Sequence, residues 1–185
     1  MRIDERFLAF EFSDLWQVIK YDESVQHTQR MQLLDSKGVD VVALHPNLIM
    51  FLEIKDFRGR RIENKYKFGG SLARTVAQKV RDSVAGVVGQ VGVDSSPSTW
   101  TATAKSLIDR RANVIVVLFV EQELRESVNR RKARMTVEGG LLKRHLRWLA
   151  ARSLVVDRDT YCDLLPDIQV MSLPGAAGMS GGGKE

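Results

Sequence analysis

The stretch over residues 38–57 constrains the fold more than any other part of the chain. Two runs rich in β-branched and aromatic residues flank His45-Pro46-Asn47, which is typical of a turn, so the sequence predicts a β-hairpin. Side chains alternate between the faces of a strand, and the loop length decides which residues oppose each other. A loop of two or four residues places Asp40 opposite Glu53 and puts Lys55 on the same face, whereas a loop of odd length separates Asp40 from Glu53.

Three charged side chains interrupt this otherwise apolar hairpin. Their neighbours point the other way and predict a core: Val39, Val41, Leu52 and Ile54. Asp40 and Glu53 repel each other when they are opposed, and buried carboxylates are costly unless they are paired or bound to a metal. Hard oxygen ligands suit Mg²⁺ or Mn²⁺. We therefore favour a metal site over the alternative, an unrelated α/β binding module in which Asp40 is a turn residue and Glu53 and Lys55 form a charge pair.

Asp40 followed by Glu53-Ile54-Lys55 at the end of the next strand resembles the motif of the PD-(D/E)xK nuclease superfamily, with Val39 in place of the proline. The resemblance implies that Asp40 and Glu53 bind Mg²⁺ or Mn²⁺ together with the backbone carbonyl of Ile54, and that Lys55 serves the nucleophile. It also implies a restriction-endonuclease-like α/β fold, with a mixed central β-sheet flanked by helices, from about residue 16 to 156.

The function implied by this resemblance is that of a metal-dependent nuclease. We expect it to hydrolyse phosphodiester bonds of nucleic acid, with DNA as the expected substrate, as an endo- or exonuclease in restriction, repair or defence. The alternative is a catalytically inactive nucleic-acid-binding or assembly subunit on the same fold. We expect the chain to act as a homodimer or in a larger complex.

The N-terminal part has two interpretations. Residues 13–14 could cap a helix over residues 15–19, whereas the apolar side chains at positions 16 and 18 also allow a strand. Members of the superfamily often have an N-terminal helix that supplies another acidic residue to the site. The candidates are Glu11, Asp22 and Glu23, and we rank Asp22 first as an additional metal ligand because it follows an apolar run.

Two segments after the motif are candidates for contact with nucleic acid. Five cations in ten residues, with two aromatic residues among them, suit a loop that binds phosphates, although a solvated hairpin explains them equally well. These cations are Arg58, Arg60, Arg61, Lys65 and Lys67. A helix over residues 71–91, capped by Ser71, follows. The resemblance places its Gln78 and Lys79 beside the site, and surface solvation is the alternative.

The remaining chain alternates between helices and strands. We predict a short helix over residues 99–111, a buried strand over 112–120, a further helix with apolar positions at 141–149, and strands at 153–157 and 168–173. The basic cluster at 130–134 is a second candidate phosphate contact or a solvated surface. We expect His145 to pack at the edge of its helix. Residues 1–173 form one predicted domain, and residues 174–185 a flexible glycine-rich tail.

The composition of the chain indicates what kind of partner and which cellular compartment to expect. The net charge of +5 is compatible with a polyanionic partner. Cys162 is the one cysteine, so an internal disulfide is excluded and a reducing compartment fits. We see no apolar run of membrane-spanning length and no apolar signal region, so we expect no membrane partner and a cytoplasmic location.

Overall fold

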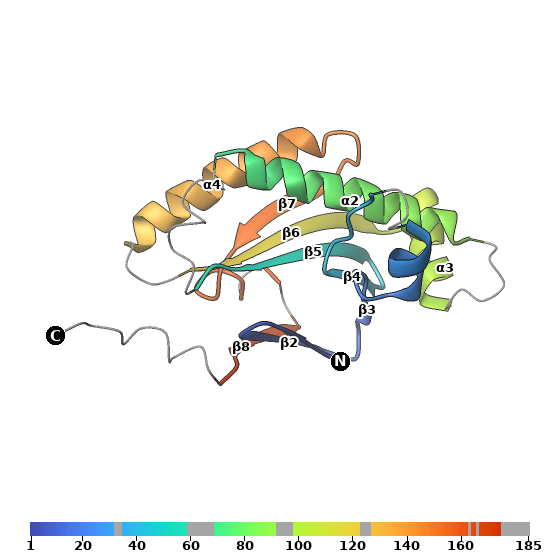
Figure 1. Cartoon of the computed structure of the whole chain (residues 1–185), viewed down its shortest axis with the longest axis horizontal. Helices are drawn as coiled ribbons and strands as arrows, with labels where there is room; N and C mark the ends of the chain where they lie inside the picture. Colours follow the sequence, from blue (N-terminus) through green and yellow to red (C-terminus); the bar gives the residue numbers. More distant parts are fainter. Residues whose placement is uncertain are drawn as a thin grey trace.

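The computed structural model of the chain describes residues 1–31, 35–58, 69–91, 98–122, 127–162, 164–165 and 167–174. The predicted class is confirmed, since the fold is mixed α/β with a five-stranded mixed sheet flanked by helices (Figure 1). Among these residues, no helix combines the length and the apolar character needed to cross a membrane. Apart from Pro174, the predicted tail lies outside the described residues.

The main sheet has the strand order β3-β4-β5-β6-β7. Its strands are β3 (Gln17–Lys20), β4 (Val41–His45), β5 (Leu48–Asp56), β6 (Asn113–Glu121) and β7 (Arg152–Val156). Neighbours are antiparallel from β3 to β5, and β6 and β7 continue the sheet in parallel. β5 and β6 are central strands with nearly all of their residues buried, as the apolar run at 112–120 predicted.

The hairpin has the even register on which the candidate site depends. His45 pairs with Leu48, so the loop consists of the two residues Pro46 and Asn47. The ladder continues to the pair Val41 and Leu52. One step further along, the same register places Asp40 opposite Glu53, and the two carboxylates share a face of the sheet.

Helices cover one face of the main sheet. The helical elements are η1 (Gln26–Met31, a π-helical turn), α2 (Ser71–Gly89), α3 (Ser98–Ile108) and α4 (Val128–His145). The core between them and the sheet contains Val76, Trp100 and Leu142 packed with Phe51 and Leu118. One helix, α4, includes both the basic cluster at 130–134 and the first of the apolar positions predicted near 141–149, namely Leu141 and Leu142. Trp148 lies beyond its end and is 52% exposed, so the predicted packing of this residue is wrong.

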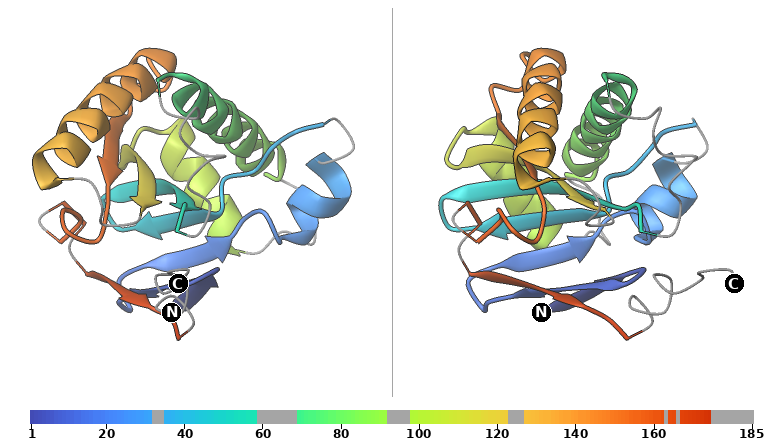
Figure 2. Two further views of the ribbon diagram at one scale, coloured as in Figure 1. Left: turned by 60° about the vertical axis from the view of Figure 1, so that its left-hand side comes forward. Right: turned by 90° about the vertical axis from the view of Figure 1, so that its left-hand side faces the viewer.

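A second, three-stranded antiparallel sheet covers the opposite face of the main sheet (Figure 2). Its order is β1-β2-β8, formed by β1 (Arg2–Glu5), β2 (Leu8–Phe12) and β8 (Ile168–Ser172). Its apolar side chains bury the lower face of β5 and β6; the ring of Phe10 meets that of Phe119 edge-on, with centroids 5.0 Å apart.

Of the two interpretations of the N-terminal part, the structure confirms the strand. Residues 17–20 pair with β4 as strand β3 and thereby satisfy their backbone hydrogen bonds in the sheet. The predicted strands at 153–157 and 168–173 both exist, but in different sheets. β7 extends the main sheet, whereas β8 pairs with β2, over 150 residues earlier in the chain.

Candidate active site

Asp40 is held at the amino end of β4 by backbone contacts. Its own carbonyl accepts a hydrogen bond from the backbone N–H of Tyr21 at 2.9 Å. Its carboxylate oxygen Oδ2 accepts the backbone N–H of Ile54 at 2.6 Å. The preceding residue, Val39, donates its N–H to Ser83 Oγ of α2 at 3.0 Å. These contacts join β3, β5 and α2 around Asp40, and its second carboxylate oxygen, Oδ1, faces Lys79.

Glu53 is fully buried, with 0% of its surface exposed, and its carboxylate meets an ammonium group from α2. Lys79 Nζ lies 2.7 Å from Glu53 Oε1 and 3.0 Å from Oε2. The same Nζ lies 3.5 Å from Asp40 Oδ1. One cation therefore bridges the two carboxylates that the hairpin register brings together.

Lys55 completes the cluster from the solvent side. Its Nζ pairs with Glu53 Oε1 and donates a hydrogen bond to the backbone carbonyl of Ile54 at 3.2 Å. The side chain of Lys55 is 29% exposed, against 19% for Lys79 and 0% for Glu53. The three functional groups predicted from the motif are thus in contact or share a partner, and Lys55 marks the side on which the cluster opens to solvent.

Burial and charge act in opposite directions on the protonation of this cluster. Burial raises the pKa of the Glu53 carboxyl above its ordinary value and the charge of Asp40 adds to this, whereas Lys55 and Lys79 act to lower it. For Lys79, burial acts to lower the pKa, but the charges of Glu53 and Asp40 outweigh it and raise the pKa above its ordinary value. A second positive charge near Glu53 therefore stabilises the ionised carboxylate.

The Tyr21 side chain packs closely against Gly86 of α2 and against Gly38, two residues before Asp40; we call this arrangement the Tyr21 slot. It sets the distance between α2 and the segment that contains Asp40. A Cβ atom at Gly86 would lie 2.1 Å from Tyr21 Oη, and one at Gly38 would lie 2.7 Å from the Tyr21 ring. Only glycine fits at these two positions while Tyr21 keeps its place. Tyr21 in turn binds the Asp40 carbonyl.

The start of α2 is held by a side chain from α4 rather than by the predicted Ser71 cap. The N-cap is Gly70, whose φ of 109° suits glycine. The buried carboxylate of Glu138 accepts the backbone N–H of Gly69 at 3.1 Å and that of Ala73 at 2.8 Å. A carboxylate at a helix N-terminus satisfies N–H groups that have no partner within the helix, and its charge is favourable there. This contact sets the position of α2 along the sheet and therefore the reach of Lys79.

Among the three candidate N-terminal acids, Asp22 is the one whose protonation is influenced by Asp40. It lies two residues after β3, and burial, then the charges of Asp40 and Glu5, raise the pKa of Asp22 to about 6. The other two candidates lie elsewhere. Glu11 is in β2 of the small sheet, 3.8 Å from Arg2, and Glu23 pairs with Lys20 at 2.6 Å.

The predicted nucleic-acid contacts are dispersed. Arg58 binds Asp56 with Nε at 2.9 Å and Nη2 at 2.6 Å, and it also donates to the Phe7 carbonyl and to Ser172 Oγ, so it ties the main sheet to the small sheet. Gln78 is half-buried on α2 and makes no hydrogen bond to Asp40, Glu53 or Lys55. Four predicted contacts lie outside the described residues: Arg60, Arg61, Lys65 and Lys67.

The donor set fits a hard divalent cation of the Mg²⁺ type. Mg²⁺ is commonly bound through one or two carboxylates, with water and substrate phosphate in its other positions. Asp40 and Glu53 are two carboxylates already arranged around one shared cation, and the Ile54 carbonyl faces the same cluster through Lys55. Over the ranges that the structure describes, no group of three or more His, Cys, Asp or Glu side chains is placed to hold a metal ion. A site here rests on two carboxylates.

Sequence reasoning identified the motif residues but missed the parts that hold them. Tyr21 with its glycine slot and Glu138 at the start of α2 carry no motif. The one available signal was Gly86, an unfavourable residue inside a helix pattern.

Comparison of the chain with protein-family models, with curated proteins and with solved structures found no match.

Proposed function

We propose that the protein is a metal-dependent nuclease that hydrolyses phosphodiester bonds of DNA. The observation that carries this proposal is the shared cation: Asp40 and Glu53, opposed on two strands and buried, already bind one ammonium group between them. Burying two carboxylates side by side costs stability unless a cation accompanies them. A site that concentrates negative charge around one cation position suits a divalent ion.

Each side chain has a distinct role in this proposal. Asp40, Glu53 and the Ile54 carbonyl would hold Mg²⁺ or Mn²⁺, which when bound supplies Lewis-acid chemistry and a water of lowered pKa. The hydrogen bond from the Ile54 N–H keeps the Asp40 carboxylate oriented. Lys55, on the solvent side, would orient the attacking water and stabilise charge that develops on the phosphate.

Lys79 has a second role in the same cluster. Its ammonium occupies the position between the two carboxylates, where it neutralises them without a divalent ion. When Asp40 and Glu53 bind a divalent cation, the Lys79 side chain, which is 19% exposed, is available to contact a phosphate oxygen of the substrate. Lys79 would therefore stabilise the empty site and then bind the substrate.

Cleavage assays on wild-type protein and two variants test the proposal. We expect wild-type protein to cleave labelled DNA with Mg²⁺ or Mn²⁺ and not with chelator. Lys55→Ala should lower the rate by about 10²-fold or more, because it removes a group that acts in the transition state. Lys105→Ala is the matched control, since Lys105 is an exposed lysine of α3. Equal cleavage by Lys55→Ala and the control, or cleavage that persists in chelator, would contradict the proposal.

A second candidate function is a non-catalytic nucleic-acid-binding or assembly subunit on the same fold. One observation favours it, since Lys55 and Lys79 together neutralise the charges of Asp40 and Glu53 without any metal. Such a protein would bind DNA equally well with chelator and with Mg²⁺, and would cleave none of the substrates. The same assay therefore separates the two functions.

A further inference from the structure

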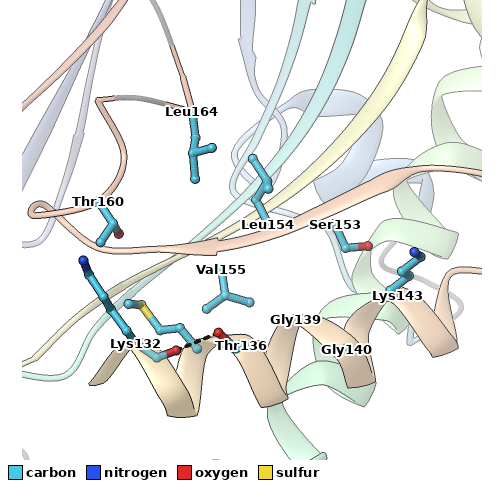
Figure 3. A pocket seen from close by; sticks show the side chains of 11 residues that line it. Lys132, Thr136, Gly139, Gly140, Lys143, Ser153, Leu154, Val155, Thr160 and Leu164 are labelled. Carbon is cyan, nitrogen blue, oxygen red and sulfur yellow. Dashed lines mark hydrogen bonds between the residues drawn. The ribbon is translucent and has the colours of Figure 1, made fainter. Parts of the chain in front are cut away.

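A groove with a volume of about 390 Å³ lies between α4 and β7, the edge strand of the main sheet (Figure 3). Apolar side chains form much of its lining, among them Met135, Leu154 and Val155. Glu53 lies on β5 and Asp40 directly precedes β4, and β6 separates β5 from β7, so the groove is distinct from the candidate active site.

Two lysines stand at opposite ends of the groove (Figure 3). Lys132 lies at the end next to Thr160, and Lys143 at the end next to Ser153. A separation of 11 residues returns to nearly the same side of an α-helix and spans about 16 Å along its axis. The groove therefore presents two cations on one line, separated by an apolar floor.

The exposed charged side chains from residue 127 to residue 152 are all basic. Over residues 127–152, which the structure describes without a gap, the one acidic residue is Glu138, and it is buried against the start of α2. The exposed cations in this stretch are Arg130, Lys132, Lys143, Arg144, Arg147 and Arg152. The nearby exposed carboxylate of Asp159 is paired with Arg131 of α4, so the six exposed cations leave an excess of positive charge that attracts a polyanion.

Two adjacent glycines, Gly139 and Gly140, line the middle of the groove. Glycine inside a helix lowers its stability relative to alanine. The packing of the chain does not require either glycine: a Cβ at Gly140 would meet nothing within 4 Å, and one at Gly139 would lie 3.7 Å from Val155, an ordinary contact. The bare helix backbone instead leaves room for a partner that approaches α4 closely.

We propose that this groove binds a single strand of DNA, with phosphates at Lys132 and Lys143. Proteins that bind single strands combine a basic groove that follows the backbone with side chains, commonly aromatic, on which the unpaired bases stack. In this groove the apolar side chains are aliphatic, and they offer the bases a surface for packing. The glycines and the apolar floor lie below the two lysines, where the sugars and unpaired bases of one strand can reach. The choice of DNA rests on the proposed nuclease function, whereas the choice of an unpaired strand rests on the groove.

A second copy of the chain is a poorer occupant than nucleic acid. A two-fold symmetric contact places the same surface of both copies face to face. Here that would oppose six exposed cations with the same six, with no exposed carboxylate between residues 127 and 152 to offset the repulsion.

The position of the groove relates it to the proposed cleavage site. β5, β6 and β7 are parallel, so their carboxyl ends meet at one edge of the sheet. Lys55 lies near the carboxyl end of β5, and the Lys132 end of the groove, with Thr160, lies beyond the carboxyl end of β7. A strand that leaves the groove at Lys132 enters the edge at which Lys55 opens to solvent.

Binding measured in chelator tests the groove without any need for cleavage. The probe is a fluorescent deoxyoligonucleotide of about 16 nucleotides, as a single strand and as a duplex. The double variant Lys132→Gln, Lys143→Gln should lose affinity for the single strand by about 20-fold at 0.1 M salt, and its salt slope should fall by about 1.4, since each phosphate contact contributes about 0.7 for single strands. Affinity equal to that of the control Lys37→Gln, Lys105→Gln would overturn the proposal.

A second variant tests whether the strand lies in the groove itself. Gly139→Gln fills the groove without changing the charge, since its Cβ makes only an ordinary contact with Val155. Its matched control is Gly89→Gln, in α2, where a Cβ would meet nothing within 4 Å. We expect Gly139→Gln alone to weaken binding while thermal unfolding shows that both variants fold. Unchanged affinity, or a duplex that binds as tightly as the single strand, would overturn the proposal. Binding is measured in chelator, where the proposed cleavage does not occur, so failure here is distinguishable from failure of the nuclease proposal.

Discussion

Replacing Lys79 by methionine should convert the candidate site into one whose stability depends on a divalent ion. The substitution keeps an unbranched side chain that is shorter by one atom, and it removes the ammonium that lies 2.7 Å from Glu53 and 3.5 Å from Asp40. Removing one partner of a buried ion pair costs about 3–5 kcal/mol. Lys55 still contacts Glu53, so we expect a smaller loss in chelator, about 2–3 kcal/mol.

Thermal unfolding followed by circular dichroism measures this loss. For a protein of this size, 1 kcal/mol corresponds to about 2–4 °C, so the Tm of Lys79→Met in chelator should fall by about 4–12 °C. A divalent ion present at 100 times its Kd stabilises the folded state by about 2.7 kcal/mol and should restore most of the loss. In wild-type protein the gain should be smaller, because the ion competes with the Lys79 ammonium.

Arg74→Met is the matched control for this measurement. Arg74 is an exposed cation on the same helix as Lys79, so its replacement removes the same charge without disturbing the carboxylates. Its Tm should change little, and its gain on adding Mg²⁺ or Mn²⁺ should equal that of wild-type protein. A Lys79→Met variant that gains no more from the ion than Arg74→Met does would refute the idea that Asp40 and Glu53 share a position for a divalent cation.

Three further substitutions should change the stability of the protein in directions that the structure determines. Gly86→Ala, whose new Cβ collides with Tyr21, should destabilise the protein by about 1–3 kcal/mol in denaturant unfolding. Gly140→Ala on α4, whose new Cβ meets nothing, should stabilise it by about 1 kcal/mol. Stabilisation by both substitutions would contradict the Tyr21 slot. Burial raises the pKa of Asp22 from 3.8 to about 6, so the folded state binds the proton more tightly and stability falls as the pH rises through this window. Asp22→Asn should therefore be more stable than wild-type protein at pH 7, by about 1 kcal/mol after allowing for solvent screening, and this advantage should vanish at pH 4; an equal difference at both pH values would contradict it.

The hairpin and its charged residues were predictable because their geometry is local. Two turn residues between alternating strands define the register, and the register alone brings Asp40 and Glu53 together. The position of Lys79 followed from the resemblance, which gave Gln78 equal weight. The structure distinguishes them, since Lys79 contacts both carboxylates.

The parts that were missed depend on contacts between distant residues. Pairing of β2 with β8 joins residues such as Phe10 and Val170 and leaves no local pattern. The residue pattern at 15–19 is compatible with a helix or a strand, and the strand forms because β4 lies beside residues 17–20 and pairs with them. Glu138 is one acid among many cations of α4, and its role appears only when the start of α2 lies against it.

The small sheet is built from strands at both ends of the described chain, and this limits the order in which the protein can fold during synthesis. The residues of the candidate site, from Asp22 to Lys79, leave the ribosome well before β8 at residues 168–172. Until β8 arrives, β1 and β2 form only a hairpin, and an isolated two-stranded hairpin is marginally stable. The apolar lower face of β5 and β6 therefore stays incompletely covered until nearly all of the described chain has been made. Closure of this layer comes last, and it is the stage at which a nascent chain is most open to aggregation or to capture by a chaperone.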